Sequence, residues 1–195
     1  MIELVADFAG VRDEVAAVTE AAMRGELDFA ASLRRRLALL AGLPAAMLDE
    51  ARDRVRLTAG TRELIAGVHE AGGVVAAVSG GFTAVLDPLA AELRLDAWRA
   101  NELEVAEGRL TGGVVGPVVD GAVKRESLLG WAAEWGVPAA RTVAIGDGAN
   151  DLPMMAAAAL SVAFDAKPAV RAAASVVLPE RDLSRVLPLL GLPRP

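Results

Sequence analysis

The sequence predicts an α/β domain built on a parallel sheet and preceded by a helical cap. Three observations predict this fold class. Helix-type apolar spacing fills the first third of the chain, short apolar runs then alternate with helical patterns, and two of those runs end in glycine-rich loops. Strands that alternate with helices are typical of parallel sheets, and a run that is apolar on both faces suits a buried parallel strand.

Residues 1–57 are predicted to form the cap, a small bundle of short helices that each bury one apolar face. Apolar residues recur at spacings of four, three and four over residues 11–22, which indicates a helix. Asp28 can cap the next helix, whose apolar stripe begins at Phe29. Gly42 and Pro44 end that helix, and another helical pattern follows.

Residues 58–190 are predicted to form the α/β core, and residues 191–195 a short tail. A helix from Thr61 stops at a glycine pair and leads into the apolar run 74–78, which resembles a buried strand. A second such run covers residues 142–145. The remaining strands are expected at residues 97–105, 161–164 and 175–178, with a hairpin at 109–120 and helices from Thr83 and over 124–135.

The composition excludes several kinds of site and partner. The chain has no cysteine, which excludes disulfides, thiolate metal sites and thiol catalysis, and it has one histidine. Its 20 Lys and Arg against 26 Asp and Glu give a net charge of −6, which argues against nucleic acid or an anionic membrane as a partner. The acidic start lacks the basic region of a secretory signal, and no apolar stretch reaches the ~20 residues of a spanning helix. We therefore expect a cytoplasmic protein that acts on a small molecule.

The sharpest local signal is Gly-Asp-Gly-Ala-Asn-Asp at residues 146–151, which follows a predicted buried strand and precedes a helix. Asp147, Asn150 and Asp151 would then lie at the C-terminal end of a parallel strand, where open α/β sheets bind their ligands. Hard oxygen ligands at such a loop suit Mg²⁺ with a substrate phosphate. The alternative is an ordinary turn, because glycine, asparagine and aspartate mark turns in any case.

Two weaker signals point to an anion. Ser79-Gly80-Gly81 follows the other buried run and precedes a helix, so a hydroxyl and backbone N–H groups could cradle a phosphate there. Lys124 opens a helix after the predicted hairpin and could neutralise a phosphoryl oxygen. Taken alone, a glycine turn and a solvated lysine explain both features. The run of three arginines at residues 34–36 is a solvated helix face by the same argument, although one of the three could grip a carboxylate.

The order of these segments resembles the haloacid dehalogenase-like phosphatases and, within them, the phosphoserine phosphatases. The similarity extends over nearly the whole chain, and its cap portion, residues 22–36, points to the phosphoserine type. The segments that carry it are residues 22–29, 32–34, 78–82, 100–101, 110–112, 119–120, 146–152 and 166–168.

The resemblance implies Mg²⁺-dependent hydrolysis of L-phosphoserine to serine and phosphate, the last step of serine biosynthesis. It implies that Lys124 neutralises the phosphoryl group, Asp147 binds the metal and Asp151 supports the metal shell. It further implies that six more residues bind the substrate: the phosphate pair Ser79 and Gly80 (through its N–H), Asn150 on the phosphate or its nucleophile loop, Arg36 on the carboxylate, and Met23 with Phe29 in the apolar lid. Arg36 shares a helix face with Phe29, so we expect Arg36, and neither neighbouring arginine, to face the substrate between cap and core.

The chain departs from the family at one motif. No Asp-x-Asp-x-Thr sequence, which in the family supplies the nucleophile, the acid/base and a metal ligand, is present. In the family it follows the first, central strand, so the resemblance implies a Rossmann-like sheet without that strand. Two expectations follow: the strands at 74–78 and 142–145 are not paired directly with each other, and the 195 residues alone are inactive.

Two other functions stay open at this stage. The substrate could be another small phosphomonoester, although Arg36 and the cap segment favour phosphoserine. The chain could also be a non-catalytic pseudo-phosphatase that keeps the metal and phosphate loops as a binding module. Retention of Lys124, Asp147, Asn150 and Asp151 argues against that alternative.

Overall fold

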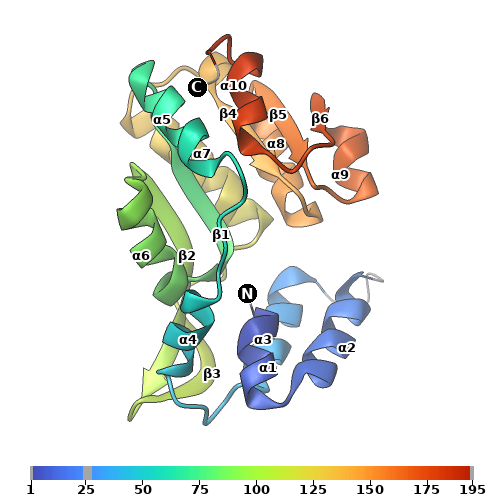
Figure 1. Cartoon of the computed structure of the whole chain (residues 1–195). Coiled ribbons are helices and arrows are strands. Elements are labelled where there is room, and N and C mark those ends of the chain that lie inside the picture. Colours follow the sequence, from blue (N-terminus) through green and yellow to red (C-terminus); the bar gives the residue numbers. More distant parts are fainter. Residues whose placement is uncertain (1, 24–27, 194–195) are drawn as a thin grey trace. The chain divides into compact units, whose positions relative to one another are not determined.

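The computed structural model describes residues 2–23 and 28–193 and is an α/β structure with parallel strands, as the sequence predicts (Figure 1). It divides into two compact units, and two strands and one helix contribute residues to both. The first unit holds Met1–Val55, Ser79–Leu89 and Arg99–Asp120, and the second holds Arg56–Val78, Ala90–Trp98 and Gly121–Pro195.

The helices predicted in residues 1–57 are present in the first unit, where the described part of this segment forms four. They are α1 (Ile2–Ala9), α2 (Arg12–Met23), α3 (Phe29–Ala38) and α4 (Met47–Asp53). Asp28 caps α3 as predicted, because its carboxylate accepts a hydrogen bond of 2.7 Å from the Ala31 N–H. Leu33 and Leu37 of α3 are buried in the core of this unit.

The first unit does not coincide with the predicted cap. Its core cluster combines Leu33 of α3 with Phe82, Leu110 and Val118, which come from much later in the chain. These later side chains are apolar and need burial, and the short cap helices offer the matching surface. The boundary at residue 57 lies close to the end of the first segment of this unit, but residues 79–89 and 99–120 join it as well.

A hairpin supplies most of the later residues of the first unit. β2 (Ala97–Ala106) pairs antiparallel with β3 (Arg109–Val115). The prediction of a separate hairpin at residues 109–120 is therefore wrong, since this segment holds only the second arm. The turn between the strands is made by Glu107 and Gly108, whose φ angles of 51° and 74° are the positive pair that a tight hairpin turn requires.

β1 (Ala76–Phe82) lies beside β2 in a sheet of order β1-β2-β3. The strand begins two residues later than predicted and continues through the serine and both glycines. Asp96 explains the late start, because it pairs with Val75 in both directions. The Asp96 carboxylate accepts the Val75 N–H at 2.7 Å, and the Val75 carbonyl accepts the Asp96 N–H at 2.9 Å.

The second sheet is parallel and has the order β4-β5-β6, with β4 at Val143–Gly146, β5 at Leu160–Phe164 and β6 at Val176–Leu178. All three strands lie within one residue of their predicted bounds. β1 and β4 belong to different sheets, which confirms that they are not paired directly with each other. The remaining helices are α5 (Thr61–Glu70), α6 (Thr83–Leu93), α7 (Gly121–Glu134), α8 (Leu152–Ala157), α9 (Pro168–Ala173) and α10 (Val186–Leu189).

Helix α7 begins three residues before its predicted start, so Lys124 lies in its first turn. Helix α7 packs on α8, and α8 packs on β4 and β5 (Figure 1). Within the expected tail, the Leu192 N–H donates to the Leu187 carbonyl at 3.0 Å. No helix in the described part of the chain is long and apolar enough to cross a membrane.

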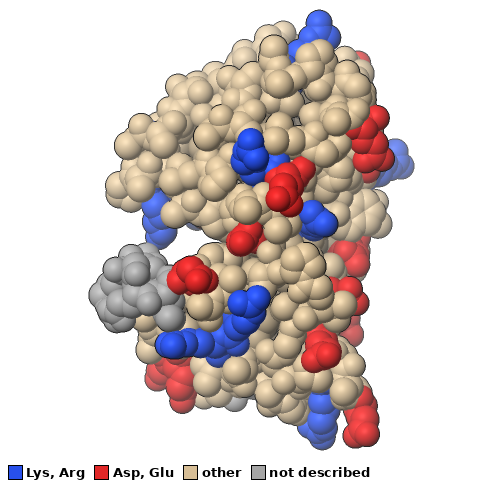
Figure 2. Space-filling model, turned by 180° about the vertical axis from the view of Figure 1, so that it is seen from behind, with Lys and Arg blue, Asp and Glu red and all other residues tan. Residues whose placement is uncertain are grey.

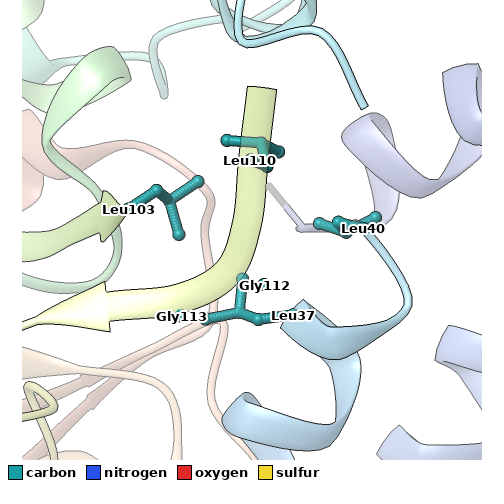
Figure 3. Close-up of a pocket in the computed structure, with 6 residues that line it drawn as sticks. All are labelled: Leu37, Leu40, Leu103, Leu110, Gly112 and Gly113. Carbon is teal, nitrogen blue, oxygen red and sulfur yellow. The ribbon is translucent and has the colours of Figure 1, made fainter. Parts of the chain in front are cut away.

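One small pocket in the first unit is lined by leucines and glycines (Figure 3). It has no charged or polar side chain, so it suits neither a phosphate nor a metal. Its lining residues are Leu37, Leu40, Leu103, Leu110, Gly112 and Gly113.

On the molecular face drawn in Figure 2, Lys and Arg side chains lie among Asp and Glu side chains, and the two signs are interspersed.

Candidate functional site

A buried ion pair joins Lys124 of α7 to Asp151, the residue just before α8. The Lys124 Nζ donates to Asp151 Oδ1 at 2.6 Å, and the two side chains are only 8% and 5% exposed. Lys124 is therefore not the solvated surface lysine that its sequence context alone would favour. A charged pair so far from water requires further hydrogen bonds to offset the loss of hydration.

The second oxygen of Asp151 supplies those bonds. Asp151 Oδ2 accepts the backbone N–H groups of Asp147 and Gly148, each at 3.0 Å. The loop after β4 is thus wrapped around one carboxylate. Gly146 makes this approach feasible, because a Cβ at that position would lie 2.5 Å from the Asp151 Cβ. Glycine is required here by close contact and not by a positive φ angle.

Asp147 and Asp151 have opposite electrostatic environments. Although Asp147 is exposed, the protein around its carboxyl group removes part of its hydration. This desolvation and the negative charge of Asp151 raise the pKa of Asp147, and the charge of Lys124 only partly opposes them. Burial also disfavours ionisation of Asp151, but the Lys124 ion pair and the N–H groups of Gly148 and Asp147 outweigh it and lower the pKa of Asp151. The loop therefore holds one firmly ionised carboxylate and one, on the exposed Asp147, that a cation would stabilise.

We expect Asp147→Asn to raise the free energy of unfolding at pH 7. The pKa of Asp147 is raised in the folded chain, so its ionised form costs stability at pH values above that pKa, and the cost disappears as the pH falls. Urea unfolding at pH 7 and below about pH 3.9, the ordinary pKa of aspartate, measures the effect. The gain should vanish at the lower pH. Glu126→Gln, at an exposed site on α7, is the control, and equal gains from both variants would contradict the prediction.

Asn150 is half-buried in the same loop. Its side-chain oxygen lies 2.8 Å from the position that a Cβ on Gly148 would take, and its carbonyl lies 3.1 Å from the corresponding position on Gly121. Glycines on both sides therefore allow the loop to pack closely against the start of α7. In the second unit the structure brings together Lys124, Asp147, Asn150 and Asp151.

The other group of predicted residues lies in the first unit, around the end of β1. The Ser79 hydroxyl is half-buried and accepts the Gly81 N–H at 3.0 Å. The ring of Phe29 closes over Gly80, where a Cβ would meet the Phe29 Cζ at 2.7 Å. A side chain at position 80 would therefore have to displace the Phe29 ring.

Arg36 is half-buried on α3, whereas Arg34 and Arg35 are exposed, in keeping with the predicted helix face. Its Nε donates to the Ser32 carbonyl at 3.2 Å. The Ser32 side chain lies between Phe29 and Arg36 on that face, is 1% exposed, and has a hydroxyl with no hydrogen-bond partner among the described residues. Met23 ends α2, but its side chain lies outside the described residues.

Asn101 is a residue of this group to which the sequence assigned no role. It is 2% exposed on β2, and its side chain reaches the two glycines at the end of β1. Its role is not visible locally, because its partners lie about twenty residues away in the sequence. The signal that could have drawn attention to it is that residues 100–101 are among the segments that carry the family resemblance.

Comparison with known proteins gives the ancestry of the chain. The haloacid dehalogenase-like hydrolase family matches residues 3–156. The phosphoserine phosphatase of Streptomyces coelicolor is 56% identical over 194 residues, which are 100% of this chain and 47% of that protein. The phosphoserine phosphatase of Streptococcus thermophilus is 46% identical over 190 residues, 97% of this chain and 88% of that protein.

A solved structure titled as a substrate-bound phosphoserine phosphatase complex superposes with a TM-score of 0.91 at 41% identity, covering 97% of this chain and 90% of that one. The chain spans about half the length of the Streptomyces relative and most of the Streptococcus one. With these matches over nearly its whole length, the chain belongs to the haloacid dehalogenase-like hydrolase family and is homologous to the phosphoserine phosphatases.

Proposed function

We propose that these residues form the phosphate- and metal-binding part of a phosphoserine phosphatase, which hydrolyses L-phosphoserine to serine and phosphate as the last step of serine biosynthesis. The observation that carries the proposal is the buried pair of Lys124 and Asp151 around which the Asp147 loop, residues 147–150 after β4, is folded. Such a pair is costly to bury and leaves one lysine charge and one exposed carboxylate at the C-terminal end of a parallel strand. Both groups suit a phosphate with its cation.

The donor set fits Mg²⁺ through a single carboxylate. Within residues 2–23 and 28–193 no three acidic or histidine side chains gather into a metal cage. Mg²⁺ is commonly held by one or two carboxylates together with substrate phosphate and water, so Asp147 is enough as the ligand from this loop. Asp151 acts by positioning Asp147, because both of its oxygens already accept hydrogen bonds. The metal would supply positive charge at the phosphoryl oxygens.

The roles of this chain's own residues follow from their chemistry. Lys124 stabilises negative charge on the phosphoryl group, and Ser79 with the Gly80 N–H binds phosphate oxygens. Asn150, in the loop after β4, also binds the phosphate. Arg36 binds the substrate carboxylate as a fork of two donors, and Phe29, together with Met23, forms the apolar lid.

The 195 residues contain no Asp-x-Asp-x-Thr sequence, so no carboxylate of that motif is available to accept the phosphoryl group. We therefore propose that this chain by itself binds phosphoserine without hydrolysing it. Hydrolysis by the purified chain, measured as release of inorganic phosphate from phosphoserine with Mg²⁺, would contradict this part of the proposal.

Calorimetric titration with phosphoserine, with and without Mg²⁺, tests the function itself. We expect phosphoserine to bind more tightly than glycerol phosphate, which lacks the carboxylate and the amino group, and we expect Mg²⁺ to strengthen both. Equal affinity for the two compounds would favour the alternative of a general phosphomonoester site. Absence of binding by either compound would contradict the proposed function.

We expect Arg36→Ala to raise the Kd of phosphoserine roughly tenfold to a hundredfold, the usual weight of a hydrogen bond between charged groups. The Kd of inorganic phosphate should stay unchanged, because phosphate has no carboxylate. Arg35→Ala removes an exposed arginine one residue away and is the matched control. A larger effect from Arg35 than from Arg36 would show that the assignment of the carboxylate ligand is wrong.

A further inference from the structure

The side chain of Asn101, in the first unit, makes three hydrogen bonds to the backbone. Its Nδ2 donates to the carbonyls of Gly80 and Gly81 at 3.0 and 3.3 Å, and its Oδ1 accepts the Val119 N–H at 2.8 Å. Both ends of a buried amide are thus used on backbone groups. A buried amide is costly unless its donors and acceptor are all paired, so its neighbours must hold these positions.

The two glycine carbonyls have an unusual arrangement. In a pleated strand, successive carbonyls point to opposite sides, but those of Gly80 and Gly81 both face Asn101. None of the described peptide bonds is cis, so each N–H points away from the carbonyl of its own peptide. The N–H groups of Gly81 and Phe82 are therefore turned away from Asn101, and that of Gly81 reaches the Ser79 hydroxyl at 3.0 Å.

We propose that Asn101 is a positioning residue for phosphate binding. It holds the carbonyls of Gly80 and Gly81 on one side, so that the N–H groups of the same two peptides, those of Gly81 and Phe82, face the opposite side beside the Ser79 hydroxyl. This inference rests on the proposed function, since it takes the serine–glycine loop as the phosphate-binding loop, and it adds the Gly81 and Phe82 N–H groups to the Gly80 N–H proposed there. Asn101 itself does not touch the anion in this arrangement.

The bond to Val119 fixes where Asn101 is held. Val119 is 2% exposed and lies in the segment that connects β3 to α7. Asn101 thus anchors the end of β1 to a second, buried stretch of backbone. A loop tied on one side in this way loses little further freedom when an anion binds on its other side, which favours binding.

Titration of the wild-type chain with inorganic phosphate tests this geometry without any variant. In ¹⁵N-correlated NMR spectra, the amide signals of Gly81 and Phe82 should shift, while the side-chain NH₂ signal of Asn101 should move little. A dominant shift of that side-chain signal would overturn the inference, because Asn101 would then contact the anion directly. Unshifted Gly81 and Phe82 signals during saturable binding would also overturn it.

Two variants measure the contribution to affinity. Asn101→Leu removes both ends of the amide, and Asn101→Asp keeps the acceptor for Val119 but loses the donors to the glycines. We expect both to raise the Kd of phosphate roughly tenfold to a hundredfold, as misplacement of binding groups commonly does. Lowering the pH should partly restore Asn101→Asp relative to the wild type at the same pH, because a protonated carboxyl can donate again.

Thr142→Val is the matched control. Thr142 is also buried, and its hydroxyl links two backbone groups, the Ala139 carbonyl at 2.7 Å and the Ala159 N–H at 3.2 Å. Its loss should lower stability without changing the Kd of phosphate. A folded Asn101→Leu chain that binds phosphate like the wild type would overturn the inference, and if the variants do not fold, the NMR titration decides.

The same titrations separate this inference from the proposed function. If the wild-type chain binds inorganic phosphate but not phosphoserine, the substrate assignment is wrong and the test of Asn101 still stands. If the chain binds neither compound, both proposals are overturned.

Discussion

Lys124→Met is expected to lower the free energy of unfolding by about 3–5 kcal/mol, because it leaves the buried Asp151 carboxylate without its cation. This is a large share of the ~5–15 kcal/mol that stabilises an ordinary domain. The Kd of phosphate should rise as well, since a preorganised positive charge is lost. In a protein that also carries the nucleophile sequence, the hydrolysis rate should fall roughly 10²–10³-fold. Urea unfolding and phosphate titration measure the first two effects.

The chain provides a matched control, because it has only two lysines. Lys167 is exposed before α9, and its link to the Asp147 loop is a backbone N–H that donates to the Asp147 carbonyl at 3.0 Å. Lys167→Met keeps that bond and should change stability by less than about 0.5 kcal/mol. Equal losses from the two variants would contradict the importance of the buried pair.

The pH dependence of the Lys124 effect has a definite sign. The pKa of Asp151 is lowered in the folded chain, so its ion pair contributes stability above the unfolded pKa of about 3.9 and loses that contribution as the pH falls through the folded value. The difference between wild type and Lys124→Met should therefore be full at pH 7 and shrink below about pH 3.9. A difference that stays constant over this range would exclude the carboxylate as its cause.

Gly146→Ala is expected to destabilise the chain by about 1–3 kcal/mol or more, the usual cost of overpacking. The new methyl group would lie 2.5 Å from the Asp151 Cβ and 2.8 Å from its Cγ. A Cβ is fixed to the backbone and cannot rotate away, so the loop must move and its bonds to the carboxylate must lengthen. The Kd of phosphate should rise together with the loss of stability.

Gly130→Ala tests whether the close contact is the cause. Gly130 lies inside α7, and nothing is within 4 Å of the position its Cβ would take. Alanine is the better helix former by about 1 kcal/mol, so this variant should be more stable than the wild type. Destabilisation of similar size by both substitutions would show that the glycine contact at Gly146 has no special role.

The parallel sheet could be predicted from the sequence because its signal is local. Each of β4, β5 and β6 is an apolar run bounded by polar or glycine residues, and the structure places all three within one residue of the predicted bounds. The start of β1 could not be predicted in this way. Val75 is apolar and strand-like, but Asp96, which lies 21 residues away, takes both of its backbone groups.

The turn of the β2–β3 hairpin and the role proposed for Asn101 could not be predicted from local sequence either. The turn at Glu107 and Gly108 depends on two positive φ angles, and glutamate gives no sign of adopting one. Asn101 acquires its role only when the chain folds β1 beside β2. The residues of the Asp147 loop, by contrast, stand together in the sequence, and the structure brings them together with Lys124.

The tip of the β2–β3 hairpin is an exposed turn, and exposed turns ordinarily tolerate inserted peptides or affinity tags. Here the segment after α3 pairs with it: the Ala45 N–H donates to the Gly108 carbonyl at 2.9 Å, and the Leu110 N–H donates to the Leu43 carbonyl at 2.9 Å. An insertion at Gly108 would break the first of these bonds and disturb the anchorage of the helix that carries Arg36. The exposed turn at Gly72, where a Cβ would meet nothing within 4 Å, is the better place for such an insertion.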